Sequence, residues 1–363
     1  MKKLLSIFTI IITLTLLFSS NLYATNATNE NIENTITQYL SNSLEEQKEL
    51  KVIANNYIVP NSDLYKYDKL KSKLLVKWYK GIGVKIRSYN INLKINSIKV
   101  EENLIRVDLD STIKFRYDNV DFDSGYTDNH IIYLTTAGDK LLVEKDIFEM
   151  DKKAEEVEKN EIHNSLNHDG YKEYINNKIK LLEEREYTFE KDIERFKNPV
   201  KKETPLQATS LGNISLLSIT YDSYAAASWA LDHVYDQEDY PGADCTNFVS
   251  KALNHGGLPT DGTWYQGSNA WIRVIELRDW LVNKGYANQY SSYSYAQLGD
   301  VIQYKYASNG LFSHSVIVTG KDNWSSYPYV SAHTSARYNV LASIYYPDNP
   351  TFSGYRVLDV HGI

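Results

Sequence analysis

The chain has 363 residues, of which 23% are charged and 42% hydrophobic, and its formal net charge is -7. These values are ordinary for a globular protein of about two domains. The acidic balance, with no basic patch or arginine-rich run, excludes nucleic acid as an expected partner.

Residues 1–27 have the pattern of a secretory signal peptide. Two lysines precede an apolar run from Leu4 to Phe18, and small and polar residues follow it. The run is short for a membrane span, and no comparable apolar stretch follows. We therefore expect cleavage after Ala24 or Ala27 and a secreted, extracellular protein with no membrane contact afterwards. An uncleaved anchor is the alternative.

Residues 28–169 are predicted to form a small α+β domain, with helices first and then a strand meander. Apolar residues recur at helical spacing in its first part, namely at Ile32, Ile36, Leu40 and Leu44. The segment DKLKSKLLVKWYKG predicts a second helix. Alternating apolar residues around Leu93 and Val107 predict strands, and HIIYLTTAGDKLLVEKDIF predicts a hairpin that turns at Gly138 and Asp139.

The acidic segment DNVDFDSGYTDN, residues 118–129, resembles a calcium loop in composition only. Its spacing lacks the EF-hand register and the closing bidentate glutamate. We expect a solvated hairpin connection here and no metal site.

Residues 170–197 predict a charged helix, because oppositely charged residues recur four positions apart in GYKEYINNKIKLLEEREYTFEKDIERF. The helix could be a spacer or a packing arm. Prolines and polar residues without a clear period follow, so we place an inter-domain linker at 198–220.

Residues 221–363 predict a second α+β domain, with helices up to about Gly285 and strands afterwards. The segments YDSYAAASWALDHVYD, CTNFVSKALNHGG and NAWIRVIELRDWLVNKG predict three helices. The segments GDVIQYKY, SHSVIVTG, YPYVSAHT and GYRVLDV predict strands, as do residues 343–346. Helices followed by an antiparallel sheet define the α+β class.

Cys245 is the single cysteine, so it cannot form an intramolecular disulfide, and it is either an inert buried residue or a reactive thiol. Asp244 is a good N-cap residue, which places Cys245 at the first helical position. There the unpaired backbone N–H groups and the helix dipole favour a thiolate, the form that a cysteine nucleophile needs.

Two of the eight histidines lie where they could serve such a thiolate. His314 begins a predicted strand and could face the helix end that carries Cys245. His333 follows on the next predicted strand and could touch the first imidazole across the hairpin. A structural role is the default for either histidine alone.

The motifs DCTNFVSKALNHGGLP, a tryptophan at Trp264, GDVIQY, HSVIVTG and YVSAHT occur in this order between residues 221 and 346. This part of the chain resembles the putative amidase domain family of secreted Gram-positive proteins. That family is similar to the NlpC-type cysteine peptidases and the CHAP amidases, which share a papain-like fold and cleave peptide bonds of the bacterial cell wall.

The resemblance implies Cys245 as the nucleophile, His314 as the general base and then acid, and His333 as the residue that orients His314. It also implies a peptidoglycan peptide as substrate, a cell-wall association, and no cofactor or metal. Trp264, Tyr265 and Trp324 lie in predicted loops that could line a cleft for substrate, although buried packing explains them as well.

Three other classes remain open at this point. A zinc enzyme with Cys245, His314 and His333 as ligands has enough protein ligands, but the usual short-spaced ligand pair is missing. A non-catalytic wall-binding module would keep the fold without needing the thiol. An acyl transferase would use the same thioester with an amine acceptor in place of water.

Overall fold

The computed structural model describes residues 28–101, 103–148, 154–161, 168–198, 220–322 and 327–363. The predicted signal peptide, nearly all of the predicted linker and Trp324 lie outside these described residues. Within them, no helix is long and apolar enough to cross a bilayer.

Two helices open the described chain, α2 (Asn29–Glu49) and α3 (Asp63–Ile82). Each begins at a hydroxyl N-cap: the side chain of Thr28 accepts from Asn31 N, and that of Ser62 accepts from Tyr65 N. Their apolar faces are buried, including Ile32, Ile36, Leu44 and Trp78. Both predicted helices are confirmed.

Four antiparallel strands follow as a meander: β1 (Ile86–Glu101), β2 (Leu104–Tyr117), β3 (Ser124–Ala137) and β4 (Lys140–Ile147). The β3–β4 hairpin turns at the predicted place, where Gly138 has a φ of 64°. The acidic segment connects β2 to β3 as expected, although its second half is already part of β3.

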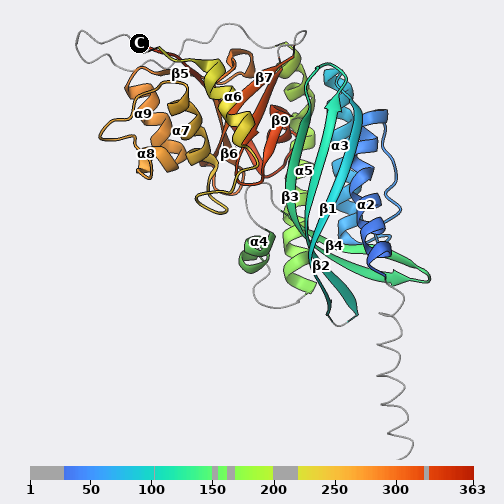
Figure 1. Ribbon diagram of the computed structural model, residues 1–363. Helices are drawn as coiled ribbons and strands as arrows, with labels where there is room; N and C mark the ends of the chain where they lie inside the picture. Colours follow the sequence, from blue (N-terminus) through green and yellow to red (C-terminus); the bar gives the residue numbers. More distant parts are fainter. Residues whose placement is uncertain (1–27, 102, 149–153, 162–167, 199–219, 323–326) are drawn as a thin grey trace, which may run out of the picture.

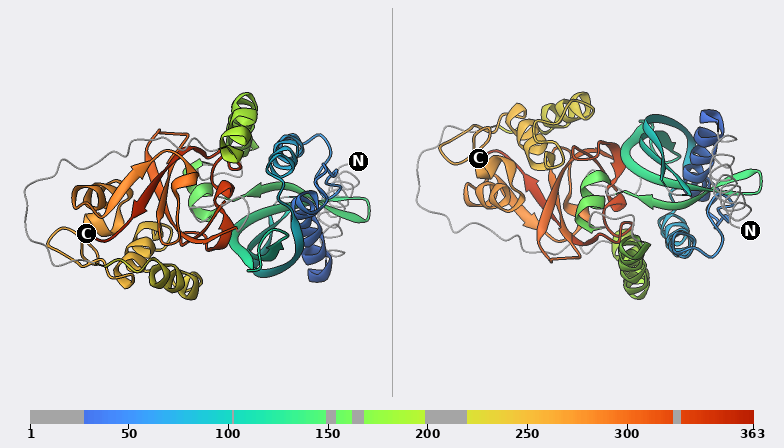
Figure 2. Two further views of the ribbon diagram at one scale, coloured as in Figure 1. Left: turned by 90° about the horizontal axis from the view of Figure 1, so that it is seen from above. Right: turned by 90° about the horizontal axis from the view of Figure 1, so that it is seen from below.

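The predicted charged helix is α5 (His168–Lys197), preceded by the short α4 (Ala154–Glu161). It is a packing arm, because its side chains reach the C-terminal half of the chain. Arg185 donates to the backbone oxygens of Pro347 and Phe352, and the Phe196 ring lies 4.3 Å from that of Tyr327. Figure 2 shows α5 at the junction of the two halves.

The C-terminal half begins with helices α6 (Ser223–His233), α7 (Cys245–His255), α8 (Asn269–Ile272) and α9 (Val274–Asn283). The prediction of one helix from NAWIRVIELRDWLVNKG is wrong. Arg273 has φ -120° and ψ 137°, an extended conformation that separates α8 from α9.

The remaining strands are β5 (Ala287–Tyr290), β6 (Val301–Tyr306), β7 (Phe312–Lys321), β8 (Pro328–Ala332), β9 (Arg337–Leu341) and β10 (Phe352–Val360). Short 3-10 helices η1 (Tyr293–Tyr295) and η2 (Ala342–Ile344) lie between them. The strand predicted at 343–346 is wrong, because β8 turns back tightly: Ala332 pairs with Arg337, and the returning strand β9 ends at Leu341.

The ten strands of the described residues form one sheet, in the order β1-β2-β3-β9-β8-β7-β6-β10-β5 with β4 paired to β3. The two halves of the chain meet where β3 pairs with β9, at Gly125↔Tyr338 and Tyr126↔Arg337. The predicted α+β class is therefore confirmed, whereas the joining of strands from both halves into one large antiparallel sheet was not predicted (Figure 1).

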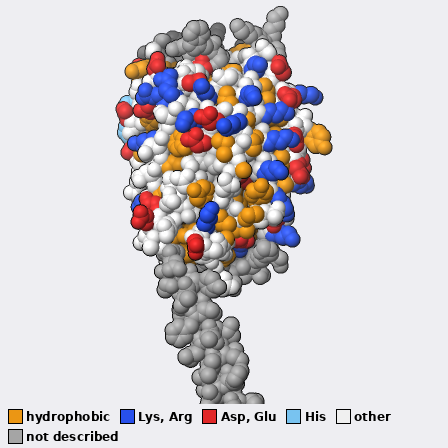
Figure 3. Space-filling model, turned by 90° about the vertical axis from the view of Figure 1, so that its right-hand side faces the viewer, with side chains coloured by type: hydrophobic (Ala, Val, Ile, Leu, Met, Phe, Trp, Pro, Cys, Tyr) orange, Lys and Arg blue, Asp and Glu red, His pale blue; other side chains and the backbone are white. Residues whose placement is uncertain are grey.

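The C-terminal part of the sheet is covered on both faces. Helices α6 to α9 cover one face and share a core with Val301, Ile317 and Leu358. Tyr304 and Val316, on the opposite face, belong to the core that includes the N-terminal helices. We call these the α7 face and the N-terminal face. On the outer surface beside α2, side chains of both charge signs are interspersed with apolar ones (Figure 3).

Candidate active site

Cys245 is the first residue of α7, as the sequence predicts. The helix ends at Gly256 and Gly257. A Cβ at Gly256 would lie 2.6 Å from the Tyr221 ring, and Gly257 has a φ of 99°. The first backbone bond of the helix runs from Phe248 N to Asp244 O. The amides of Cys245, Thr246 and Asn247 thus have no acceptor within the helix.

Asp244 occupies the N-cap position, but its side chain makes no capping hydrogen bond. The predicted N-cap position is therefore confirmed, but the capping hydrogen bond expected of an N-cap aspartate is not made. The carboxylate instead accepts from Tyr240 N at 3.1 Å, from Asn247 Nδ2 at 2.9 Å and from His333 Nδ1 at 2.6 Å. Its oxygens hold a histidine and a loop at the start of the helix.

His333 follows the end of β8 and lies on the α7 face, with its ring 4.2 Å from the Phe248 ring. Its Nδ1 is bonded to Asp244, and its Nε2 lies 2.9 Å from the backbone oxygen of His233. Both partners are acceptors, so with an ionised Asp244 the ring satisfies both bonds only when both nitrogens carry protons. The arrangement is a buried histidine–carboxylate pair at the start of the helix that carries Cys245.

The turn after His333 is strained. Thr334 and Ser335 have φ values of 60° and 69°, a left-handed conformation that is rare for a β-branched residue. The Thr334 hydroxyl accepts from Asp244 N at 2.7 Å, and Thr334 N donates to Glu238 Oε1 at 2.8 Å. Glu238 Oε2 accepts from Gly242 N at 2.7 Å. These bonds attach the turn to the loop that precedes Cys245.

His314 lies on the N-terminal face, away from α7. It pairs with Tyr304 across β6 and β7. The centre of its ring lies 4.8 Å from the ring centre of Tyr345 and 6.0 Å from that of Phe352. The next residue, Ser315, faces α7 and accepts from the Thr246 hydroxyl at 3.2 Å. Because successive residues of a strand point to opposite faces, His314 is directed away from the cysteine helix. The expectations that it faces Cys245 and touches His333 are not met.

The surroundings of His314 are those of a core residue. Its side chain is fully buried, and neither ring nitrogen has a hydrogen-bond partner among the described residues. Burial, with a smaller contribution from the charge of Arg337, lowers its pKa to about 3. The ring is therefore neutral at ordinary pH.

The three aromatic residues proposed for substrate binding have different positions. Trp264 is fully buried, packs 4.3 Å from the Trp280 ring and donates to Ser250 Oγ at 3.2 Å, so it belongs to the core and lines no cleft. Tyr265 is exposed. It lies two residues before Gly267, and a Cβ atom at Gly267 would lie 3.6 Å from the Tyr240 hydroxyl. The loop that carries Tyr265 therefore lies beside Tyr240. Trp324 lies outside the described residues.

Sequence reasoning missed Glu238 and Thr334, which connect the strained turn to the Cys245 loop. Glu238 lies in the polar stretch DQEDY and has no pattern that marks it. For Thr334, its position next to His333 in YVSAHT was the one weak signal.

A zinc site is not assembled here. Within the described part of the chain, no three His, Cys, Asp or Glu side chains are grouped so that they could hold a metal ion. His314, one of the three proposed ligands, lies on the opposite face of the sheet from Cys245 and His333.

A thiol at a helix start, a histidine and a carboxylate are residue types used in acyl transfer to cysteine. A comparison with protein families points to the same kind of reaction. Residues 220–355 match a family model described as "Putative amidase domain". The match supports amide-bond hydrolysis by this part of the chain.

Two proteins of Bacillus subtilis (strain 168) are similar to part of this chain. Uncharacterized protein YjcM is 32% identical over 134 residues, which cover 33% of this chain and 32% of YjcM. Uncharacterized protein YhbB is 34% identical over 105 residues, covering 25% and 33% of the two chains. The matched region thus spans about a third of each relative. No solved structure matches the chain.

Proposed function

We propose that the protein is a secreted, cysteine-dependent amide hydrolase that acts on peptides of the bacterial cell wall. Cys245 is the nucleophile, and His333, oriented by Asp244, is its acid–base partner. The observation that carries the proposal is the position of the single cysteine, at the start of α7 beside the buried Asp244–His333 pair. The amidase-domain match supports an amide as the substrate bond.

His333 is a better partner for the thiol than His314. Asp244 precedes Cys245 directly and bonds Nδ1 of His333, so the ring is oriented by a carboxylate as in other nucleophile–histidine–acid sites. His314 has neither a carboxylate partner nor a path to the thiol on its own face of the sheet. In this proposal His333 has the acid–base role that the family resemblance implies for His314, Asp244 has the orienting role, and His314 has no catalytic role.

The reaction begins with attack of the Cys245 thiolate on the amide carbonyl carbon. The C–N bond then breaks, the leaving amine takes the proton from Nε2 of His333, and a thioester remains on Cys245. Neutral His333 next removes a proton from water, whose oxygen attacks the thioester carbon. The C–S bond breaks, the acid leaves, and the thiolate–imidazolium pair is restored.

The start of α7 is suited to stabilise the negative charge that develops on the carbonyl oxygen when the thiolate attacks. The amides of Cys245 and Thr246 precede the first backbone bond of the helix and are suited to hold the developing oxyanion, together with the positive end of the helix dipole. Nε2 of His333 now donates to His233 O, and it must exchange this acceptor for the reacting atoms when substrate binds. Catalytic hydrogen bonds often align only in the substrate complex.

The choice of substrate rests on one feature of the sequence and one of the structure. The first 27 residues predict export, and an exported amidase of the resembled family meets peptidoglycan outside the cell. The exposed Tyr265, beside the loop that holds Tyr240, offers an aromatic surface for a peptide or sugar.

The test is mass spectrometry of purified peptidoglycan and its soluble peptides after incubation with the wild-type protein, Cys245→Ala and Cys245→Ser. We expect new amine and carboxylate ends, which differ in mass from the substrate by one water, with the wild type only. Circular dichroism should show that both variants are folded, because each removes or changes a single small atom group.

Three results would contradict the proposal. Turnover by Cys245→Ala at the wild-type rate would exclude the cysteine mechanism. Binding of the wild type to peptidoglycan without any bond cleavage would indicate a wall-binding module, and products that carry an added amine would indicate acyl transfer.

A further inference from the structure

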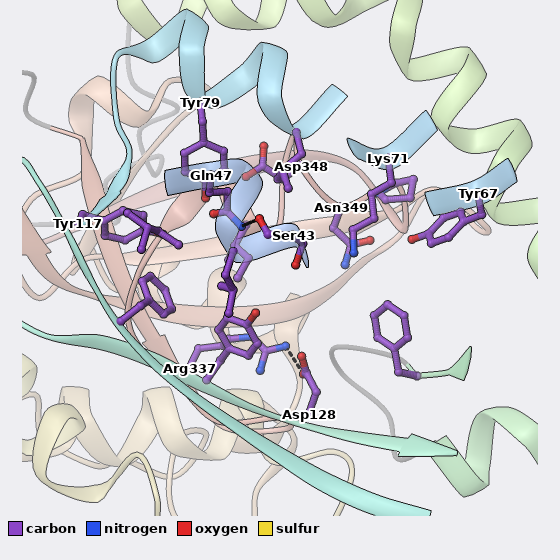
Figure 4. Close-up of a pocket in the computed structure, with 18 of the residues that line it drawn as sticks. Ser43, Gln47, Tyr67, Lys71, Tyr79, Tyr117, Asp128, Arg337, Asp348 and Asn349 are labelled. Atoms are coloured by element: carbon purple, nitrogen blue, oxygen red, sulfur yellow. Dashed lines mark hydrogen bonds and ion pairs between the residues drawn. The ribbon is translucent and has the colours of Figure 1, made fainter. Parts of the chain in front are cut away.

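A cavity of about 120 Å³ lies between the two halves of the chain, on the N-terminal face of the sheet. Helices α2 and α3, strands β1 to β3 and residues 344–350 surround it, together with Arg337 of β9 (Figure 4). Tyr338, the next residue of β9, stacks on Tyr235 near α6. Neighbouring residues of a strand point to opposite faces of a sheet, so Arg337 and the cavity lie on one face, and Tyr338 and the helices α6 and α7 lie on the other. The sheet therefore separates the cavity from Cys245.

The walls of the cavity are mostly apolar, and aromatic rings form a large part of them. Six rings contribute to them: Tyr67, Tyr79, Phe115, Tyr117, Tyr126 and Phe148. An apolar protein cavity of about 150 Å³ is large enough to bind benzene. The cavity here is somewhat smaller, at about 120 Å³, so we expect it to hold one compact apolar group no larger than a benzene ring.

Three positive side chains and two acidic ones line the cavity. Lys71, Lys178 and Arg337 all line the cavity, and Lys71 Nζ lies 5.6 Å from the centre of the Phe148 ring. Two acids face them. Asp128 is ion-paired to Arg337 at 2.5 Å, and burial raises the pKa of Asp348 well above its usual range, which favours the protonated form of its carboxyl group.

Two lining residues also have buried polar atoms without a partner. Arg337 is fully buried, and its Nε has no hydrogen-bond partner among the described residues; the same is true of Asp348 Oδ1. Buried polar atoms are nearly always paired in native proteins, so two such atoms in one lining are notable. Asp68, within electrostatic reach of Lys71, has a pKa of about 6 and offsets part of the positive charge at neutral pH.

We propose that this cavity binds a small monocarboxylate with a compact apolar body, such as an aromatic or branched short-chain acid. The rings hold the apolar body, and Arg337 and Lys71 attract the carboxylate. Asp348, whose buried Oδ1 has no partner among the described residues, donates a hydrogen bond to a carboxylate oxygen when its carboxyl group is protonated. The site is separate from the proposed hydrolytic centre, and its test does not depend on hydrolysis.

The test uses benzoate as the probe and measures binding to the purified protein by isothermal titration calorimetry. Benzamide is the neutral analogue of the same shape. We expect the wild type to bind benzoate at least tenfold more tightly than benzamide, since only benzoate carries the charge. Cys245→Ala should bind benzoate as the wild type does.

Variants of α3 locate the site. Lys71→Met removes the charge with little change in shape and should weaken benzoate binding at least tenfold while leaving benzamide binding unchanged. The matched control is Lys73→Met, because Lys73 lies on the outside of the same helix and pairs with Glu186; it should bind like the wild type. Leu75→Trp should fill the cavity and abolish binding of both probes.

The proposal is overturned if the wild type binds no benzoate at millimolar concentration, or if benzoate and benzamide bind equally. It is also overturned if Lys71→Met and Lys73→Met have the same effect. The Lys71→Met result decides the matter even if Leu75→Trp does not fold.

Discussion

Replacement of His314 by leucine tests whether this histidine belongs to the core or to the catalytic machinery. The ring is buried against Tyr345 and Phe352, and its nitrogens have no partner among the described residues. An unpaired buried polar group costs about 1–3 kcal/mol. Leucine is apolar and of similar volume, so we expect His314→Leu to fold, to be at least as stable as the wild type at pH 7, and to keep its hydrolytic activity.

The magnitude can be worked out from the pKa of His314. It is lowered to about 3 in the folded protein, against an ordinary value of 6.5. Between these values the unfolded chain binds a proton that the folded protein does not, so stability falls as the pH falls from 6.5 towards 3. At about 1.4 kcal/mol per pH unit, this group alone destabilises the wild type by about 2 kcal/mol between pH 7 and pH 5. Replacing His314 should abolish this part of the loss of stability on acidification.

The assay is urea unfolding of the wild type, His314→Leu and His314→Gln at pH 7 and pH 5. The contributions of all other groups are common to the three proteins and cancel in the comparison. Both variants should lose about 2 kcal/mol less than the wild type on acidification. An unchanged pH dependence would refute the burial of a neutral ring. A folded His314→Leu variant without hydrolytic activity would return the catalytic role to His314.

Three further predictions concern the site and the shared sheet. Asp244→Asn removes a charge-assisted hydrogen bond of about 1.5–3 kcal/mol, so kcat/KM should fall by roughly tenfold to 150-fold in steady-state assays, and a wild-type value would exclude Asp244 as the orienting group. Thr334→Val should cost about 1–3 kcal/mol in urea unfolding because it leaves Asp244 N unpaired, whereas Thr334→Ser should not; equal effects would exclude this bond. A fragment that begins at Ser218 exposes the N-terminal face, including Tyr329 and Tyr345, and should aggregate or bind a hydrophobic dye; a soluble fragment of full stability would contradict the shared core.

Local patterns predicted the helices and hairpins well, because each depends on neighbours in the sequence. The start of α7 at Cys245 follows from the apolar spacing behind it and the two glycines that end it. The β3–β4 turn follows from a glycine between two apolar runs. Neither feature needs a distant contact.

The face occupied by His314 could not be predicted. Val316, Ile317 and Val318 are all buried, because β7 is covered on both faces. In such a continuous apolar run, polar and apolar residues do not alternate, so the sequence does not show which residues point to which face of the sheet. An irregularity in the pairing of β6 and β7, next to His314, adds to the ambiguity. The partner of the thiol was therefore open until the strand was placed.

Long-range contacts explain the other differences. Asp244 looks like a helix cap in the sequence, but His333, 89 residues later, takes its carboxylate. Likewise the short pairing of β3 with β9, which places the cavity between the two halves, has no sequence signature. Both arise from residues that meet only in the folded chain.

The central claim is that Cys245 forms a thioester with the acyl part of its substrate. The most direct measurement is intact-protein mass spectrometry after acid quenching of the wild-type protein during turnover of peptidoglycan peptides, followed by peptide mapping. The account predicts an acyl adduct on the peptide that contains Cys245, lost on treatment with hydroxylamine. Product formation with no adduct on that peptide, together with an active Cys245→Ala variant, would contradict it.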